Sequence, residues 1–232
     1  MKTYKLNTTQ DFDYKDQNHA AWQCAKEELL LPNTAGKDIV PRTTFALLRS
    51  PTHLYFKITA EDTDPKSTLT GYNDPLYNEE AVEIFISPDG SHTRYFEFET
   101  NHLGAVFAAW INRDEQDNRT IDFVKQNPAE LSVTTSKSGW VTTGKLCLAS
   151  VTAGRQRDES QALVAAPIVY LTRTDRQRCD CKSSSNASAG SAGATFNVYR
   201  IKRTGTGEMM LSAFSPTGID NFHVPSKFVK FI

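Results

Sequence analysis

Three glutamates, Glu83, Glu97 and Glu99, are spaced so that they can share one surface of a β-hairpin. Side chains alternate across a strand, so every second residue points to the same face. Carboxylates crowded on one face repel each other unless water, a cation or a ligand compensates them. Three uses are therefore open: a solvated outer face, a surface that binds sugar hydroxyl groups, or a pair of carboxylates for glycoside hydrolysis.

The same hairpin has a second, apolar face. Val82, Ile84 and Ile86 alternate with the acidic residues on its first strand, and Phe96 and Phe98 continue the apolar face on its second strand. A fold needs only one of these faces in its core. The opposite face collects carboxylates, an amide and aromatic rings, which suits a ligand rich in hydroxyl groups. Its members are Glu83, Phe85, Tyr95, Glu97, Glu99 and Asn101.

Two tyrosines stand on the loop before this hairpin. Tyr72 and Tyr77 flank the turn of Asn73, Asp74 and Pro75. An aromatic ring on a loop can stack on the C–H groups of a pyranose, while carboxylates and amides at its rim take the hydroxyl groups. The alternative for either tyrosine is packing over the sheet edge.

Asp62 and Asp64 follow a predicted strand directly. Closely spaced carboxylates in a loop can hold calcium together with backbone carbonyls. The segment lacks the glycine and the terminal glutamate of an EF-hand loop, so a polar turn is the competing expectation.

The four cysteines are Cys24, Cys147, Cys179 and Cys181, and the last two are separated by a single residue. This spacing is too tight for the usual zinc knuckle. We expect free thiols, with a loop disulfide or a metal site as the alternatives.

Short β-like runs, separated by turn residues, must position these side chains. Besides the hairpin at 82–98, with its turn at Pro88, Asp89 and Gly90, they cover 43–49, 54–60, 104–111, 131–135, 140–148, 163–172, 196–202 and 209–214. Residues 21–30 fit a short helix or an edge strand. The pattern predicts an all-β fold, a jelly-roll-like antiparallel β-sandwich of two sheets with at most short helices. We expect a single domain over 1–232, with a flexible, small-residue loop at about 179–194.

Composition excludes several classes of partner. The chain has 232 residues and a formal net charge of −1, so a nucleic-acid partner is not expected. No apolar run reaches membrane-spanning length, and the N-terminus lacks the apolar region of a secretory signal. We expect a monomer, located either in the cytoplasm or outside the cell after removal of a signal.

Several segments, in order along most of the chain, resemble carbohydrate-binding module family 9 and its standalone relatives. They are LYFKITAED (54–62), NDPLYNEEAVEIFISPDG (73–90), YFEFETNHLG (95–104), NVYRI (197–201) and SPTGIDNFHVPSKFVKF (215–231). The resemblance implies a β-sandwich related to DOMON domains, sometimes with structural calcium, that binds mono- or oligosaccharide ends of plant-type polysaccharides without catalysis. It also implies an association with a polysaccharide-degrading enzyme.

The resemblance assigns roles to individual residues. Tyr77 lies six positions before Glu83, where the family has one of two rings that clamp the sugar. Glu83 and Asn101 would hydrogen-bond to hydroxyl groups, with Glu97 or Glu99 as secondary acceptors. Some relatives have an arginine at the position of Glu99.

The second ring departs from the family pattern. Relatives often carry a tryptophan just before the NVYRI strand, whereas this chain has Gly193, Ala194 and Thr195. The candidates to replace it are Phe196 and Tyr199, and strand alternation decides which one faces the site.

We therefore predict a carbohydrate-binding protein that is not an enzyme and requires no cofactor, with calcium as an optional structural ion. The first alternative is a small glycoside hydrolase that uses Glu83, Glu97 and Glu99. The second is a degenerate sandwich that binds another protein.

Overall fold

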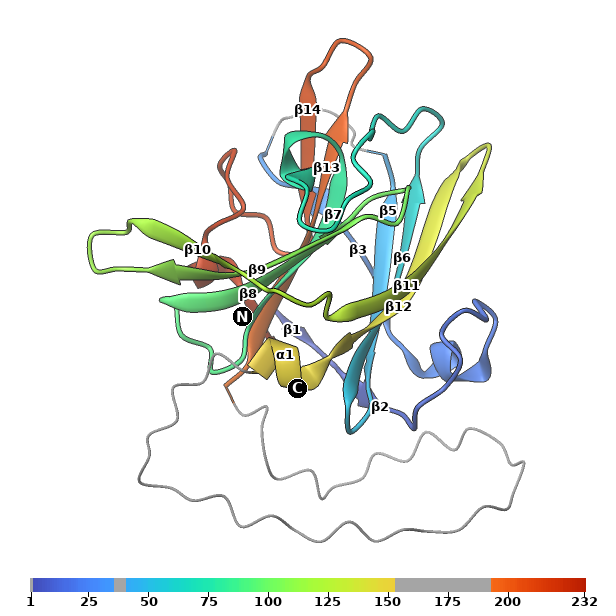
Figure 1. Cartoon of the computed structure of the whole chain (residues 1–232), viewed down its shortest axis with the longest axis horizontal. Coiled ribbons are helices and arrows are strands. Elements are labelled where there is room, and N and C mark those ends of the chain that lie inside the picture. Colours follow the sequence, from blue (N-terminus) through green and yellow to red (C-terminus); the bar gives the residue numbers. More distant parts are fainter. Residues whose placement is uncertain (1, 36–40, 153–192) are drawn as a thin grey trace, which may run out of the picture.

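The computed structural model describes residues 2–35, 41–152 and 193–232, which form two twisted β-sheets packed against each other (Figure 1). Within these residues the first sheet has nine strands and the second has six. The first sheet follows the order β1-β15-β13-β7-β8-β9-β10, with β14 paired to β13 and β4 paired to β14. The second follows β11-β12-β6-β5-β2, with β3 also paired to β5.

The bounds of the first sheet are β1 (Thr3–Tyr4), β4 (Leu31–Pro32), β7 (Ala81–Ser87), β8 (Arg94–Thr100), β9 (Val106–Arg113), β10 (Arg119–Phe123), β13 (Thr195–Arg203), β14 (Met209–Ala213) and β15 (Val229–Phe231). Those of the second are β2 (Asn7–Thr8), β3 (Glu27–Leu29), β5 (Thr43–Arg49), β6 (His53–Glu61), β11 (Ala129–Ser136) and β12 (Gly139–Cys147). The helical elements are short: η1 (Ala20–Cys24), η2 (Leu76–Asn78), α1 (Leu148–Thr152) and η3 (Pro225–Lys227).

The predicted all-β sandwich is confirmed. β5 has the expected limits, and the turn between β7 and β8 places Gly90 at a φ of 72°, a left-handed conformation that glycine adopts without strain. The 21–30 segment divides into η1 and β3, so it is neither a single helix nor a single strand. β10 was not predicted. The predicted strand at 163–172 and most of the loop at 179–194 lie outside the described residues.

The main core lies between the sheets and includes the predicted apolar face of the hairpin. Val82, Ile84, Ile86, Phe96 and Phe98 are buried there. Their partners across the core come from β5 and β6, among them Phe45, Leu47, Phe56 and Ile58.

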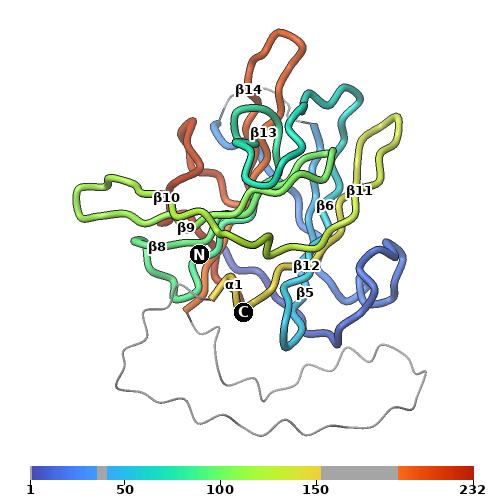
Figure 2. The backbone as a smooth tube through the Cα atoms, in the orientation of Figure 1, coloured from blue at the N-terminus to red at the C-terminus, as the bar shows by residue number. Residues whose placement is uncertain are grey.

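The opposite face of β7 and β8 is also buried, which the sequence did not indicate. Phe85 and Tyr95 belong to a second apolar cluster on the outer side of the first sheet, together with Tyr199, Phe222 and Phe228. The chain between β14 and β15 supplies Phe222 and Phe228 and lies beside β9, where Arg113 donates a hydrogen bond to the backbone carbonyl of His223 (Figure 2). This loop turns the outer face of the sheet into the wall of a site.

The two cysteines that the structure describes differ in their bonding state. Cys147 is a free thiol, whereas Cys24 is disulfide-bonded, which corrects the expectation of free thiols at Cys24. Cys179 and Cys181 lie outside the described residues.

None of the described helices is long and apolar enough to cross a membrane.

Candidate functional site

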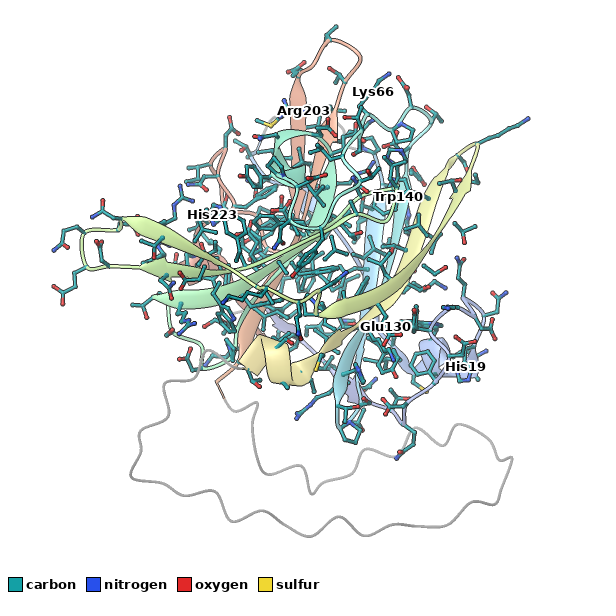
Figure 3. The ribbon with its side chains drawn as sticks, in the orientation of Figure 1. His19, Lys66, Glu130, Trp140, Arg203 and His223 are labelled. Carbon is teal, nitrogen blue, oxygen red and sulfur yellow. The ribbon has the colours of Figure 1, made fainter. Side chains whose placement is uncertain are left out.

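A pocket with a volume of about 660 Å³ opens on the outer face of the first sheet. Its floor comes from β7, β8, β9, β13 and β14, and β10 forms one wall. The loop between β14 and β15 forms another wall through Asn221, Phe222 and His223, and Tyr77 stands on η2 at the rim. Figure 3 shows His223 on the side of the molecule where β9 and β10 project.

Two of the three predicted glutamates line this pocket, and the third lies next to them. Glu83 and Glu97 face the cavity, although only 2% and 4% of their surfaces are exposed. Glu99 is fully buried and pairs directly with Glu83 across β7 and β8. Cross-strand partners of this kind have Cβ atoms about 5 Å apart, so the three carboxyl groups form one cluster.

Burial makes the carboxyl cluster difficult to ionise. It raises the pKa of Glu83, and the charge of Glu97 adds to this effect. Burial likewise raises the pKa of Glu97 to about 7 and that of Glu99 well above its ordinary value. Neither side-chain oxygen of Glu99 forms a well-aligned hydrogen bond. The floor of the pocket therefore holds protons near neutral pH and can donate as well as accept hydrogen bonds.

Tyr77 has the position predicted for a stacking ring. It is 40% exposed and contacts Phe107 edge-to-face, with ring centroids 5.6 Å apart and an interplanar angle of 87°. Phe107 is buried in the floor and also meets Phe123 of β10 edge-to-face at 5.7 Å. Tyr77 is thus anchored on one side, while much of its surface stays available to a ligand.

Neither predicted replacement for the second ring reaches the pocket. Phe196 lies in the main core and stacks on Phe231 at 4.1 Å. Tyr199 faces the correct side, but it stacks beneath Phe222 at 4.3 Å and its hydroxyl donates to the Phe222 carbonyl. Phe222, in contrast, lines the cavity, as Phe107 does. Sequence reasoning missed this position, although Phe222 lies within the segment 215–231 that resembles the family.

Asn101 and Tyr72 do not line the pocket, and their side chains form hydrogen bonds to the backbone of neighbouring loops. The Asn101 amide donates to the carbonyl of Leu69, and its side-chain oxygen accepts from the backbone N–H groups of Leu103 and Ala105. The geometry gives Asn101 a role in holding this loop, in place of the predicted contact with a hydroxyl group. Tyr72 donates its hydroxyl to the carbonyl of Val124.

His223 is a second wall residue that the sequence did not reveal as part of a site. Its Nδ1 lies 2.7 Å from the hydroxyl of Tyr95, and its ring is tilted over Phe85. Burial lowers the pKa of His223 to about 3, and the charges of Arg119 and Arg113 contribute to the decrease. The imidazole is therefore neutral and adds a polar atom to the wall without adding charge.

Asp62 and Asp64 do not fit a calcium site. The Asp62 carboxylate is buried between Arg200 Nη2 at 2.7 Å and Lys202 Nζ at 3.0 Å, so its charge is already compensated. Asp64 is exposed and pairs with Lys66. Arg200 and Lys202 therefore take the place predicted for the ion, and calcium binding elsewhere in the protein stays a prediction.

The sequence profile of the carbohydrate family 9 binding domain-like family matches residues 16–228. No curated protein is similar enough to this chain to count as a match.

Solved structures share the fold at low sequence identity. One is a protein from Bacteroides uniformis ATCC 8492 assigned as carbohydrate-binding, with 13% identity, a TM-score of 0.69 and coverage of 99% of this chain and 98% of that one. Another is a carbohydrate binding module family 9 from Caldicellulosiruptor kristjanssonii in complex with glucose, with 12% identity, a TM-score of 0.55 and coverage of 100% and 96%. The same module in complex with cellotriose has 12% identity, a TM-score of 0.53 and coverage of 100% and 92%.

Proposed function

Because the chain belongs to the carbohydrate family 9 binding domain-like family, we propose that its pocket binds carbohydrate without covalent chemistry. The observation that carries the proposal is the combination, in one cavity, of an open ring at Tyr77 and buried carboxyl groups at Glu83 and Glu97. Tyr77 stacks on the apolar face of a sugar ring, and the carboxyl groups hydrogen-bond to its hydroxyl groups. The volume lies within the range of small-molecule pockets, about 300–1,000 Å³.

The proposed ligand is the end of a mono- or oligosaccharide from a plant-type polysaccharide. The complexes of the related module with glucose and cellotriose support this class of ligand. Further proposals are that the protein is a monomer and that it acts beside a polysaccharide-degrading enzyme.

Buried carboxyl groups with raised pKa values, such as those of this cluster, also serve as acid catalysts in glycosidases. Glycoside hydrolysis needs two carboxyl groups on opposite sides of the bond that breaks. Glu83 and Glu97 project from neighbouring strands on the same face of one sheet, a placement that by itself fits either use. The match to a family of carbohydrate-binding domains favours binding over hydrolysis.

Calorimetric titration with a panel of glucose, xylose, cello-oligosaccharides and xylo-oligosaccharides tests the proposal. We expect saturable binding of at least one panel member, with affinity near the millimolar range, a binding free energy of about −4 kcal/mol. Chromatography of the same mixtures after prolonged incubation should show no shortened products. Folded protein that binds no panel member, or that cleaves one, would contradict the proposed function.

A further inference from the structure

The two groups of buried acids in this protein are compensated differently. Asp62 and Glu80 have buried cationic partners: Arg200 and Lys202 contact Asp62 at 2.7 and 3.0 Å, and Lys202 contacts Glu80 at 2.7 Å. The cluster of Glu83, Glu97 and Glu99 has no such partner among the described residues. A buried carboxylate without a cation or a proton is costly, so protons take the place in this cluster of the cation that the fold does not provide.

The charged groups that surround the cluster do not supply it. Arg119 on β10 lines the pocket and its charge acts to lower the pKa of Glu97, but the side chain is exposed to solvent and is not within ion-pair distance of the cluster. In the turn after β9, Asp117 pairs with Arg113, and Asp220 adds another acid at the opposite wall. His223 is neutral, and the hydroxyls of Tyr95 and Tyr199 bond to His223 and to a backbone carbonyl.

Glu99 shows most directly that the compensating group is absent. It is fully buried, faces the same side as Glu83 and adjoins the carboxyl group of Glu97. Neither of its side-chain oxygens has a partner in good hydrogen-bond geometry, although the backbone N–H of Tyr77 and the carboxyl group of Glu97 lie near it. Among the described residues, no three such groups converge with the geometry that a metal ion needs. The pocket opens toward Glu83 and Glu97, so a ligand is the group that can bring a donor and a positive charge to the cluster.

We propose that the pocket prefers a sugar that carries a primary amine, with its ammonium group held by Glu83 and Glu97. This inference rests on the proposed function and specifies the class of ligand. An ammonium group offers three donors and a full charge, whereas a hydroxyl offers one donor. Charge-assisted hydrogen bonds are roughly twice as strong as neutral ones.

Binding of an ammonium group also changes the protonation of the floor. A nearby positive charge favours the ionised form of a carboxyl group. The cluster should therefore release protons when an amino sugar binds and release none when a neutral sugar binds. This release distinguishes recognition of the amine from an additional contact with the sugar ring.

The test compares three probes on the full chain by calorimetry at about pH 7: glucosamine, glucose and N-acetylglucosamine, in which the amine is acylated and uncharged. Titrations in buffers with different ionisation enthalpies measure the protons released. We expect glucosamine to bind about tenfold more tightly than glucose, the gain from one charge-assisted hydrogen bond, and N-acetylglucosamine to show no such gain.

Variants connect the preference to the cluster. In Glu97→Gln the ratio of glucosamine to glucose affinity should fall toward one, and fewer protons should be released, because only Glu83 still contacts the ammonium group. Glu115→Gln, a change to an exposed acid that does not line the pocket, should keep both. Thermal unfolding confirms that each variant is folded, and Glu83→Gln replaces Glu97→Gln if that variant does not fold.

The outcomes separate this inference from the proposed function. Equal affinity for glucosamine and glucose, or a preference that persists in both glutamine variants, overturns the amine preference and leaves carbohydrate binding in place. No binding of any of the three sugars overturns the amine preference, and silence across the wider oligosaccharide panel as well contradicts the proposed function.

Discussion

Single carboxyl groups in this protein differ in their chemistry because their neighbours differ. Asp62 and Glu83 are 5% and 2% exposed. For Asp62, burial alone would raise the pKa, but the hydrogen bond from Lys202 and the charge of Arg200 hold it below its ordinary value. For Glu83, burial raises the pKa and the charge of Glu97 raises it further. The first group is an ionised structural anchor, and the second is a protonated floor for a ligand.

The role of Tyr77 can be tested by truncation. Tyr77→Ala should weaken sugar binding about tenfold or more, because an aromatic platform contributes roughly 1–3 kcal/mol by analogy with base stacking. The melting temperature should change little, since the ring is 40% exposed. Tyr72→Ala is the matched control: it removes a 36% exposed tyrosine that does not line the pocket, and it should leave affinity unchanged. Equal effects of the two changes would show that Tyr77 is not the platform.

The pKa of Glu97 predicts how stability depends on pH. Because burial raises this pKa from 4.5 to about 7, the stabilising effect of its protonated form is fully present below about pH 4.5 and is lost as the pH rises to about 7. Glu97→Gln should reduce this decrease, of which the raised pKa values of Glu83 and Glu99 keep a part, and it should stabilise the protein above neutral pH by up to about 3 kcal/mol. Urea unfolding at about pH 5 and pH 8 measures the difference. The raised pKa of Glu97 would be refuted if the stability of the wild-type protein increased from pH 5 to pH 8 and Glu97→Gln showed the same pH dependence.

At the scale of elements, the hairpin of β7 and β8 has two buried faces with different partners. One face packs against β5 and β6 in the main core, and the other lies under the loop between β14 and β15. Alternation along the strands correctly predicts which residues share a face. It does not predict the cover over the second face, because Phe222 and His223 come from more than a hundred positions further along the chain.

The core face of the hairpin can be distinguished from the pocket side by stability. Phe96→Ala should destabilise the protein by about 3–5 kcal/mol, because Phe96 is fully buried between the sheets. Phe123→Ala removes the same side chain from a position that is 56% exposed on β10, so it should cost much less. Chemical denaturation measures both values. Similar losses from the two variants would mean that the core is not centred on Phe96.

At the scale of the whole molecule, buried ion pairs join the two sheets. Arg200 on β13 reaches the second sheet, where it donates to Asp62, to Thr43 Oγ1 and to the backbone carbonyl of Glu61. Lys202, two residues further along β13, contacts both Asp62 and Glu80. These contacts join the two sheets at one edge of the sandwich.

Removal of the shared anion should destabilise the sandwich. Asp62→Asn leaves Arg200 and Lys202 undercompensated, and loss of one partner from a buried pair costs about 3–5 kcal/mol. Asp64→Asn changes an exposed aspartate two residues away and should have little effect. Since the pKa of Asp62 is lowered, the stability that it contributes is present above about pH 4 and is lost as the pH falls through its lowered pKa. Equal unfolding midpoints for the two variants in urea at neutral pH would contradict this role.

Local patterns predict the sandwich, the apolar hairpin face and the shared face of Glu83, Glu97 and Glu99, because strand alternation and turn residues act over short distances in the sequence. The choice of Tyr77 over Tyr72 as the stacking ring rests on the resemblance to the family. Long-range partners are not predictable in this way. The sequence offers Asp62 as a calcium ligand, whereas in the structure Arg200, 138 positions away, donates a hydrogen bond to its carboxylate. Tyr199 lies on the expected face, but Phe222 covers it.

The most direct test of carbohydrate binding in this pocket is a residue-level NMR titration of the amide signals with cello-oligosaccharides and glucosamine. We predict that the largest chemical-shift changes fall on Tyr77, Glu97, Phe222 and His223, which surround the cavity, and that strands β5 and β6 of the second sheet stay unchanged. Changes centred on the second sheet, or no changes in the folded protein, would contradict the assignment of this pocket as the carbohydrate site.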